Sequence, residues 1–245
     1  MNEGVLGPSI LPSWGGRLTS TDYANLERSW ITPELADQAL LRRVASSEGA
    51  AIVDRKNNNS YAGIIFPYIW PGETHIREYW LRRDHPDIRV GKDGQTREIA
   101  KYLGPPGRGN LLYFVPGTAA EWLTDATIPV ALTEGAKKTL ALYRLARHRL
   151  ADGTPPRFLA VGLAGVWNFM GSIGKHPGPD GSNRNEKGLI PDIARLVWTD
   201  RKVFVVYDSN VHSNSSVAAA RRNLSLELTQ MAAKVCWVNI PQGAA

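Results

Sequence analysis

Cysteine is the scarcest residue of this sequence, with Cys236 as the single example among 245 residues. One thiol excludes an intrachain disulfide and any zinc site built from several cysteines. Its apolar neighbours Val235 and Trp237 predict an unreactive thiol in the core. Because disulfide-free chains are typical of reducing compartments, we expect a cytoplasmic protein.

Long apolar runs are also missing, since no stretch approaches the roughly 20 residues that a membrane span needs. Residues 1–4 show neither the basic nor the apolar part of a secretory signal. A Walker-type Gly-Lys-Ser/Thr loop does not occur, so a helicase motor would have to lie elsewhere. With 43% apolar and 21% charged residues, the composition is otherwise that of an ordinary globular protein without a membrane partner.

Acidic residues are scarce in the second half of the chain. Residues 1–125 carry 14 Lys and Arg against 15 Asp and Glu, whereas residues 126–245 carry 15 against 8. The formal net charge of +6 therefore comes from the second half. A positive field suits a polyanion such as nucleic acid. Solubility alone is the alternative explanation.

Two carboxylates follow apolar runs that predict buried strands. The run 130–132 stops at Thr133-Glu134-Gly135, immediately before a helical pattern. The run 203–207 stops at Asp208-Ser209-Asn210, and another helical pattern begins near residue 215. Because parallel strands present their carboxyl ends at one edge of a sheet, Glu134 and Asp208 are expected at the same edge.

Clustered carboxylates are the ligands that Mg²⁺ or Mn²⁺ prefers, so this edge is a candidate metal site. Asp208 is the first candidate ligand, and Asn210 can add a neutral carbonyl oxygen. Each carboxylate also has a purely structural explanation. Glu134 can interact with the helix dipole, and Asp208 can cap the chain as an Asx-turn residue.

The order Thr133-Glu134-Gly135, helix, strand, Asp208-Ser209-Asn210 resembles the Toprim fold of bacterial primases, topoisomerases and some nucleases. It is most similar to Toprim-like domains of phage and plasmid primase-type replication proteins, which often show Thr-Glu-Gly-x-Lys-Lys. The resemblance implies that Glu134 is a catalytic residue, either as a metal ligand or as the general acid/base, beside Asp208. Asn210 stands where the family's Asp-x-Asp motif has its second Asp. A negative charge close to the cation interacts with it by ~1–4 kcal/mol, so the loss of that charge is expected to weaken metal binding.

The first half adds a second resemblance, to the N-terminal part of the bacterial replicative primase core. An apolar run ends in Phe66-Pro67, a hairpin with arginines follows, and Lys101-Tyr102-Leu103 comes next. In that family a Lys-Tyr-Leu segment lines the catalytic groove, which implies that Lys101 contacts nucleic acid. Weaker candidates are Arg77, Arg82 and Arg83, for which an exposed sheet face is the alternative.

Other candidates stand on the residues themselves. Lys137 and Lys138 fall in the first turn of a predicted helix, where cations oppose the helix dipole. A bound phosphate or a carboxylate would explain at least one of them, so both are candidate binding residues. Arg221 and Arg222 are expected to be solvated, and His212 is expected on the surface. The tryptophans are expected to be mostly core residues, of which Trp70, Trp80 and Trp167 could stack on bases.

The predicted organisation is α/β, with a Toprim-like, mainly parallel sheet preceded by a smaller α+β subdomain. The domains are a flexible terminus over 1–20, the α+β subdomain over 21–125, the Toprim-like domain over 126–241, and the start of a linker over 242–245. A hairpin is predicted from strands 61–69 and 75–82, and a short strand at 50–53. Residues 171–188 are rich in glycine and predicted to lack regular structure, either disordered or a phosphate-contacting flap. The second half predicts strands 128–133, 157–162, 202–207 and 235–239, and helices 135–149, 191–197 and 215–233.

Together these features predict a primase-like core of a mobile-element replication protein. The reaction would be Mg²⁺- or Mn²⁺-dependent nucleotidyl transfer from nucleoside triphosphates on single-stranded DNA. Two alternatives stay open: a catalytically weakened DNA-binding Toprim module, and a Toprim-type nuclease. The last residues suggest a fragment of a longer chain, with further domains such as a helicase.

Overall fold

The computed structural model describes residues 13–56, 59–91, 94–151, 153–179 and 181–241, without the side chain of Asn210. Of the flexible terminus expected over 1–20, residues 1–12 lie outside this range, as does the expected linker over 242–245. Within the described part of that terminus, Gly16 pairs with Arg43 and a helix begins at Ser20. Contacts divide the chain into one unit of residues 1–28 and 32–108 and another of residues 29–31 and 109–245. The second unit starts at Gly109 rather than at 126 because the strand Leu112–Tyr113 pairs with Leu159–Leu163.

Antiparallel pairing builds the sheet of the first unit, in the order β1-β2-β3-β6. The hairpin predicted near residues 61–82 is confirmed as β2 and β3, and every residue of β2 is buried. The strand predicted at 50–53 is wrong, because Glu48 accepts a hydrogen bond from the Ala45 N–H at 3.0 Å and starts a helix there. The elements are α1 (Ser20–Glu27), α2 (Pro33–Gln38), β1 (Arg42–Val44), α3 (Ser46–Ile52), β2 (Gly63–Tyr68), β3 (Glu78–Arg83) and β6 (Tyr102–Leu103).

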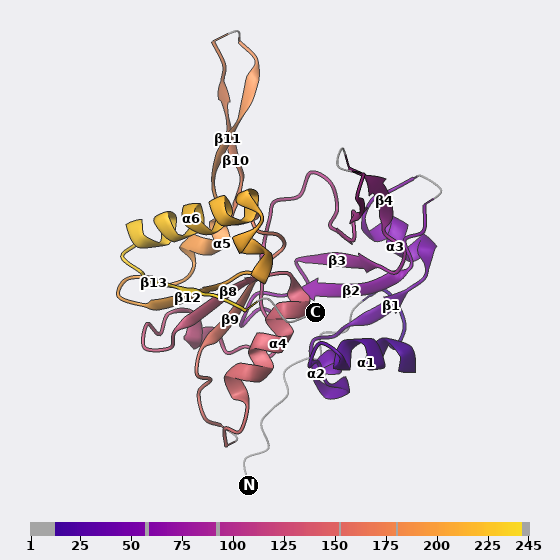
Figure 1. The fold of residues 1–245 in the computed structure, drawn as a ribbon, viewed down its shortest axis with the longest axis horizontal. Helices are drawn as coiled ribbons and strands as arrows, with labels where there is room; N and C mark the ends of the chain where they lie inside the picture. Colours follow the sequence, from indigo (N-terminus) through magenta and orange to yellow (C-terminus); the bar gives the residue numbers. More distant parts are fainter. Residues whose placement is uncertain (1–12, 57–58, 92–93, 152, 180, 242–245) are drawn as a thin grey trace. The chain divides into compact units, whose positions relative to one another are not determined.

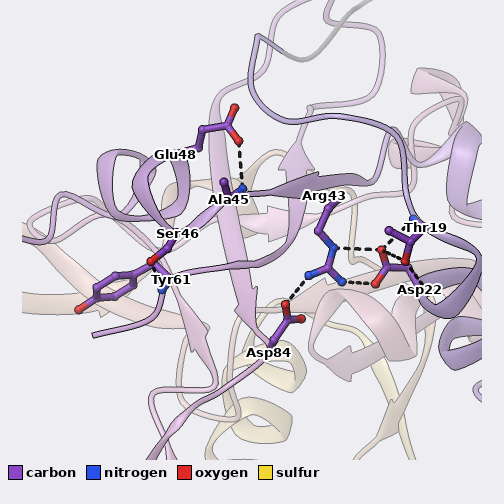
Figure 2. Close-up of polar contacts among 8 residues, drawn as sticks. All are labelled: Thr19, Asp22, Arg43, Ala45, Ser46, Glu48, Tyr61 and Asp84. Carbon is purple, nitrogen blue, oxygen red and sulfur yellow. Dashed lines mark hydrogen bonds and ion pairs between the residues drawn. The ribbon is translucent and has the colours of Figure 1, made fainter. Parts of the chain in front are cut away.

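Arg43 ties α1 to the sheet of the first unit (Figure 2). Its guanidinium, on β1, donates hydrogen bonds to the carboxylates of Asp22 on α1 and Asp84 after β3. Thr19 completes the cluster, because its hydroxyl and backbone N–H both donate to Asp22. The pKa of Asp22 stays below its usual range: burial acts to raise it, but the bonds from Arg43 and Thr19 outweigh burial.

The charged connection after β3 contains a small strand pair, β4 (Asp87–Val90) with β5 (Thr96–Ile99). The predicted turn there includes residues 92–93, which lie outside the described residues. Arg83 is almost fully buried, at 2% exposure, and donates to the Ser60 carbonyl and to Asp87. Its guanidinium also lies 4.9 Å from the Tyr61 ring, so Arg83 is a structural residue rather than a binding candidate.

A mostly parallel sheet forms the centre of the second unit, in the order β13-β12-β8-β9-β7 (Figure 1). The predicted parallel sheet is confirmed, with β7 as its antiparallel edge. Helices α4 and α6 cover opposite faces, as right-handed crossovers in opposite directions require. The elements are β7 (Leu112–Tyr113), η1 (Ala120–Leu123), β8 (Val130–Glu134), α4 (Ala136–Arg147), β9 (Leu159–Leu163), α5 (Pro191–Ala194), β12 (Lys202–Val206), η2 (Ser209–His212), α6 (Ser215–Gln230) and β13 (Lys234–Val238).

The order of these strands creates one topological switch point. The chain runs from β8 outward to β9, then crosses back to β12 on the other side of β8, and continues outward to β13. Consecutive connections therefore diverge between β8 and β12. In open α/β sheets, ligands bind outside the carboxyl ends of the strands at such a point.

The glycine-rich segment was wrongly predicted to lack regular structure. It forms an antiparallel pair, β10 (Met170–Pro177) with β11 (Asn183–Leu189), which projects away from the sheet of its unit (Figure 1). Gly171 and Gly188 are paired directly, so backbone hydrogen bonds hold the ribbon where side chains offer little. The glycine-rich composition favoured a loop. The pairing of β10 with β11 was missed because the local pattern does not specify the turn that joins them.

Two buried arginines stabilise the second unit. Arg201 is fully buried and donates hydrogen bonds to the carbonyls of Trp122, Leu123, Ile128 and Val197, and burial lowers its pKa to about 10.

Within the described residues, no helix has the length and apolar character to cross a membrane.

Arg221 corrects another prediction, because it is buried rather than solvated. Its guanidinium lies 4.2 Å from the centre of the Trp237 ring and donates to Asn239 at 3.1 Å. The neighbouring Arg222 is exposed, as expected. The paired arginines of α6 therefore have different environments, since only one of them faces β13.

Candidate functional site

Glu134 is the last residue of β8, where the buried strand reaches the switch point of the sheet. The chain turns at Gly135, whose φ of +81° is a conformation that side chains other than glycine rarely adopt. The Gly135 N–H donates to the Leu163 carbonyl at 2.6 Å, which holds the turn against the end of β9. The Glu134 side chain is therefore fixed at this edge, with 21% of its surface exposed.

Asp208 lies at the same edge, two residues after β12 ends. The register pairs Val206 with Thr133, so the two strands end side by side. Tyr207, between β12 and Asp208 in the chain, is buried, and its hydroxyl donates to the carbonyl of Val166 in the loop after β9 at 3.0 Å. This anchor leaves Asp208 pointing out of the sheet edge with 42% of its side chain exposed.

Lys138 joins the two carboxyl groups. Its ammonium lies 2.6 Å from Oε1 of Glu134 and 2.5 Å from Oδ2 of Asp208. Each carboxyl group also lies close enough to the other to shift its pKa. The second unit therefore brings together three of the predicted site residues, within contact distance of one positive charge.

The pKa values of the two acids move apart. Burial, together with the neighbouring Asp208, raises the pKa of Glu134, although Lys138 acts in the opposite direction. Burial also acts to raise the pKa of Asp208, but the hydrogen bonds from Lys138 and Glu134 outweigh it and lower that pKa. Environments that move the pKa values of two neighbouring carboxyl groups apart are typical of acid/base sites.

The donor set fits a small hard cation in part. Carboxylate oxygens are what Mg²⁺ prefers, and it often takes only one or two of them while water and phosphate oxygens complete its shell. Among the described residues, no group of three or more His, Cys, Asp or Glu side chains is placed to hold a metal. Asn210 belongs to η2, which follows Asp208, but its side chain lies outside the described part. A bound cation would have to displace the Lys138 ammonium.

The start of α4 adds backbone donors to the same edge. Gly135 is its N-cap and provides no side-chain cap, and the first turn contains no acidic residue. The first N–H groups of a helix attract anions when no side chain caps them. Lys137 follows in this turn and is half-buried. This edge therefore combines an acidic pair with groups that suit phosphate.

The remaining candidates belong to the first unit. Lys101 forms an ion pair with Glu98 at 2.7 Å, and Arg77 lies 5.5 Å from the centre of the Trp70 ring. Arg82 is half-buried on β3, opposite Ile64 and Tyr102. Lys101 and Arg82 share Glu98 as a neighbour, because both cations lower the pKa of that carboxyl group.

The tryptophans divide in the same way. Trp70 is buried at 4% exposure, and Trp80 packs against Tyr68 with ring centres 6.1 Å apart. Trp167 is 38% exposed on the loop after β9. Its indole N–H donates to the Ser216 hydroxyl at 3.1 Å, and its ring stacks on Phe169. Of the three, Trp167 alone offers a ring face at the carboxyl edge of the sheet.

We had expected Lys137 and Lys138 to contact nucleic acid or substrate, with a phosphate or a carboxylate as the partner of at least one, and Lys138 does contact carboxylates. Sequence reasoning missed its position between two of them. A signal for it was present. Glu134 and Lys138 are four residues apart, the spacing at which a carboxylate and an ammonium meet along a helix. The contact with Asp208 had no local signal, because it depends on the pairing of β8 with β12.

Fold and site together define a mixed α/β protein with a carboxylate pair at the switch point of a mostly parallel sheet. A family model described as a domain of unknown function, DUF3854, matches residues 120–244, and the chain belongs to this family. The match includes Glu134, Lys138 and Asp208. The comparison with curated proteins found no match.

Proposed function

We propose that the second unit is a Toprim-like domain and that the chain is a primase-like core of a mobile-element replication protein. The observation that carries this proposal is the pair of Glu134 and Asp208 at the switch point between β8 and β12, where both carboxyl groups contact the Lys138 ammonium. The Thr-Glu-Gly-x-Lys-Lys segment over residues 133–138 supports the same proposal. In this proposal the chain acts in the cytoplasm, and a helicase motor would belong to further domains.

The two acids have different roles in the proposed reaction. Asp208, which is ionised, would hold Mg²⁺ or Mn²⁺ together with Glu134. When bound, the cation offsets charge at the attacking and leaving oxygens of a phosphoryl transfer. Because its pKa is raised, Glu134 is the better suited of the two acids to exchange a proton. Asn210 in place of an acid reduces the charge available to the metal.

Nucleotidyl transfer balances as follows. The 3′-hydroxyl oxygen of the growing strand forms a bond to the α-phosphorus of a nucleoside triphosphate, and the bond to pyrophosphate breaks. The hydroxyl proton passes to a base, for which Glu134 is the nearest candidate. The open start of α4 and the surplus of cations over residues 126–245 favour binding of the triphosphate and single-stranded DNA at this edge.

A second function is favoured by the position of Lys138. Its ammonium already contacts both carboxyl groups, which reduces the need for a metal. With Asn210 at the second acidic position, the domain would then be a DNA-binding module without catalysis. Both versions share the fold and differ in whether a metal enters the site.

Incorporation of labelled nucleotides tests the proposal directly. The full chain is incubated with single-stranded DNA, nucleoside triphosphates and Mg²⁺ or Mn²⁺, and the products are separated by length. We expect labelled primers that disappear in Glu134→Gln and Asp208→Asn. Asp200→Asn is the matched control, because Asp200 is an exposed acid that precedes β12, whereas Asp208 follows that strand. Shortened DNA in the absence of nucleotides would indicate the nuclease instead, and intact DNA without products would favour the binding module.

A further inference from the structure

The ribbon of β10 and β11 projects away from the sheet of its unit (Figure 1). Nearly all of its residues beyond the first pairs are exposed on both strands. A two-stranded ribbon that buries no apolar face is marginally stable in water. Its base is nevertheless fixed, because Asn110 donates to the Met170 carbonyl at 2.8 Å and the Ile190 N–H donates to the Phe169 carbonyl at 3.0 Å. The ribbon is therefore an anchored arm that extends from the second unit.

The two faces of this arm differ in charge. Register pairs Ser172 with Lys187 and Lys175 with Asn185, and alternation along the strands places these pairs on one face. Lys187 donates to the Ser172 hydroxyl at 2.8 Å, in agreement with that placement. No acidic side chain lies on this face among the described residues of the two strands. We call it the lysine–asparagine face; its polar members are Ser172, Lys175, Asn183, Asn185 and Lys187.

The opposite face is mixed. It carries the cross-strand pair of His176 with Arg184, and the acidic Glu186 opposite Gly174. A bulge between Ser172 and Gly174 turns Ile173 onto this side, where its Cδ1 lies 2.5 Å from the position that a Cβ would take on Gly188. Ile173 and the acidic Glu186 thus lie on one side of the ribbon. The middle of the lysine–asparagine face carries donors and a neutral amide, with Met170 and Leu189 at one end and Pro177 at the other.

This chemistry fits a nucleic-acid duplex. Lysine ammonium groups contact phosphates, which supplies affinity that depends on salt. Asparagine amides both donate and accept, which suits the edges of bases. A two-stranded β-ribbon also has the width that the major groove of B-form DNA admits. A protein partner would be expected to find an apolar centre on the face it covers, whereas the apolar residues of this face, Met170, Leu189 and Pro177, lie at its two ends.

We propose that the arm binds double-stranded nucleic acid in the major groove through its lysine–asparagine face. The proposal rests on the proposed function for the kind of substrate and extends it. The site at Glu134 and Asp208 would act on a single strand, and the arm would hold the duplex beside it. In a primase-like reaction this duplex is the template paired with its new strand.

The test compares single substitutions that remove equal charge from opposite faces of the arm. Lys175→Ala and Lys187→Ala alter the lysine–asparagine face, and Arg184→Ala alters the other face. Binding of the full chain to a labelled duplex of about two helical turns is followed by fluorescence anisotropy over a range of salt. A labelled single strand of the same sequence is measured in parallel.

We expect each lysine substitution to weaken duplex binding several-fold and to reduce the slope of log K against log salt by about 1. Arg184→Ala should leave both quantities near those of the wild type, and single-strand binding should change little in all three. Asn185→Ala should weaken duplex binding without changing the slope. Equal losses for Lys175→Ala and Arg184→Ala would show a general electrostatic effect and overturn the proposal. Unchanged duplex binding in both lysine variants would overturn it as well.

Failure of the proposed function would be recognised separately. Asp208→Asn leaves the arm intact, so it should abolish primer synthesis while duplex affinity stays near that of the wild type. Were primer synthesis absent in every variant, including the wild type, the duplex measurements would still decide whether the arm binds. Melting temperatures of the arm variants should match the wild type, because the substituted side chains are exposed.

Discussion

Lys138 places its ammonium 2.5 Å from Oδ2 of Asp208, a residue on a different strand, while it also contacts Glu134 in its own turn. A positive charge therefore already occupies the space between the two carboxyl groups. The same space is where a divalent cation would bind. Metal binding and the Lys138 contacts are thus mutually exclusive in the proposed site.

Removing that ammonium should strengthen metal binding. In Lys138→Met, Mg²⁺ and Mn²⁺ no longer compete with a cation, and repulsion between the ammonium and the metal is gone. We expect the affinity for Mg²⁺ in the absence of nucleic acid to rise at least several-fold in calorimetric titrations. Lys202→Met is the control, because Lys202 is an exposed cation at the opposite end of β12 from Asp208. An affinity that falls in Lys138→Met would show that Lys138 supports the metal rather than replaces it.

The stability of the first unit should depend on the ionisation of Asp22. Its folded pKa lies below the ordinary value of 3.8, because the bonds from Arg43 and Thr19 outweigh burial. A lowered folded pKa gives stability that is present above pH 3.8 and is lost as the pH falls through the folded pKa. Asp22→Asn should therefore lower the free energy of unfolding by about 1.5–3 kcal/mol near neutral pH.

Urea unfolding at several pH values checks this prediction. The difference between wild type and Asp22→Asn should shrink as the pH falls below 4, because the wild type then loses the same interaction. Asp54→Asn provides an exposed acidic control in the same unit. A difference that stays constant down to the lowest pH would mean that the Arg43 cluster of Figure 2 does not act through the Asp22 charge.

Arg201 should be a major contributor to the stability of the second unit. Arg201→Met keeps much of the side-chain volume but leaves buried carbonyls without their donor. Unsatisfied buried groups cost ~1–3 kcal/mol each, so the free energy of unfolding should fall by at least about 3 kcal/mol. Arg222→Met, at an exposed position of α6, should change it by less than about 0.5 kcal/mol. Similar denaturation midpoints for the two variants would contradict the role assigned to Arg201.

The seating of α4 on the sheet depends on Gly162. A Cβ at this position would lie 2.3 Å from the Thr139 hydroxyl oxygen, so Gly162→Ala must push α4 away from β9. We expect a loss of about 1–3 kcal/mol from overpacking. Adding Thr139→Ala removes that oxygen, and the double variant should lose less stability than the sum of the single variants. Strict additivity in chemical denaturation would show that the two residues do not meet.

Much of the second unit could be predicted from the sequence, because its strands are continuous apolar runs and its helices are periodic. The run 130–132 and the run 203–207 both became central parallel strands. Their order in the sheet places Glu134 and Asp208 at one edge, and this followed from the rule for parallel strands. The ends of the helices were predicted too far along the chain, since α6 ends at Gln230 rather than at residue 233.

Other features depend on partners that are distant in sequence. The β10–β11 arm was missed because glycines and prolines mark loops locally, and the pairing that overrides them joins strands across a turn. Arg221 was expected in solvent because its own helix gives no sign of Trp237 on the neighbouring strand. Lys138 was expected to bind nucleic acid or substrate because its second acid, Asp208, approaches only in the folded sheet.

Calorimetric titration of Mg²⁺ and Mn²⁺, with and without single-stranded DNA, is the most direct test of the proposed metal site. It compares the wild type with Asp208→Asn and with the control Asp200→Asn, whose acid is 78% exposed and paired with Lys234 away from the site. We predict one binding event in the wild type and in Asp200→Asn that disappears in Asp208→Asn. Absence of metal binding in the wild type, with DNA affinity equal in all three proteins, would contradict the metal site and leave the DNA-binding module.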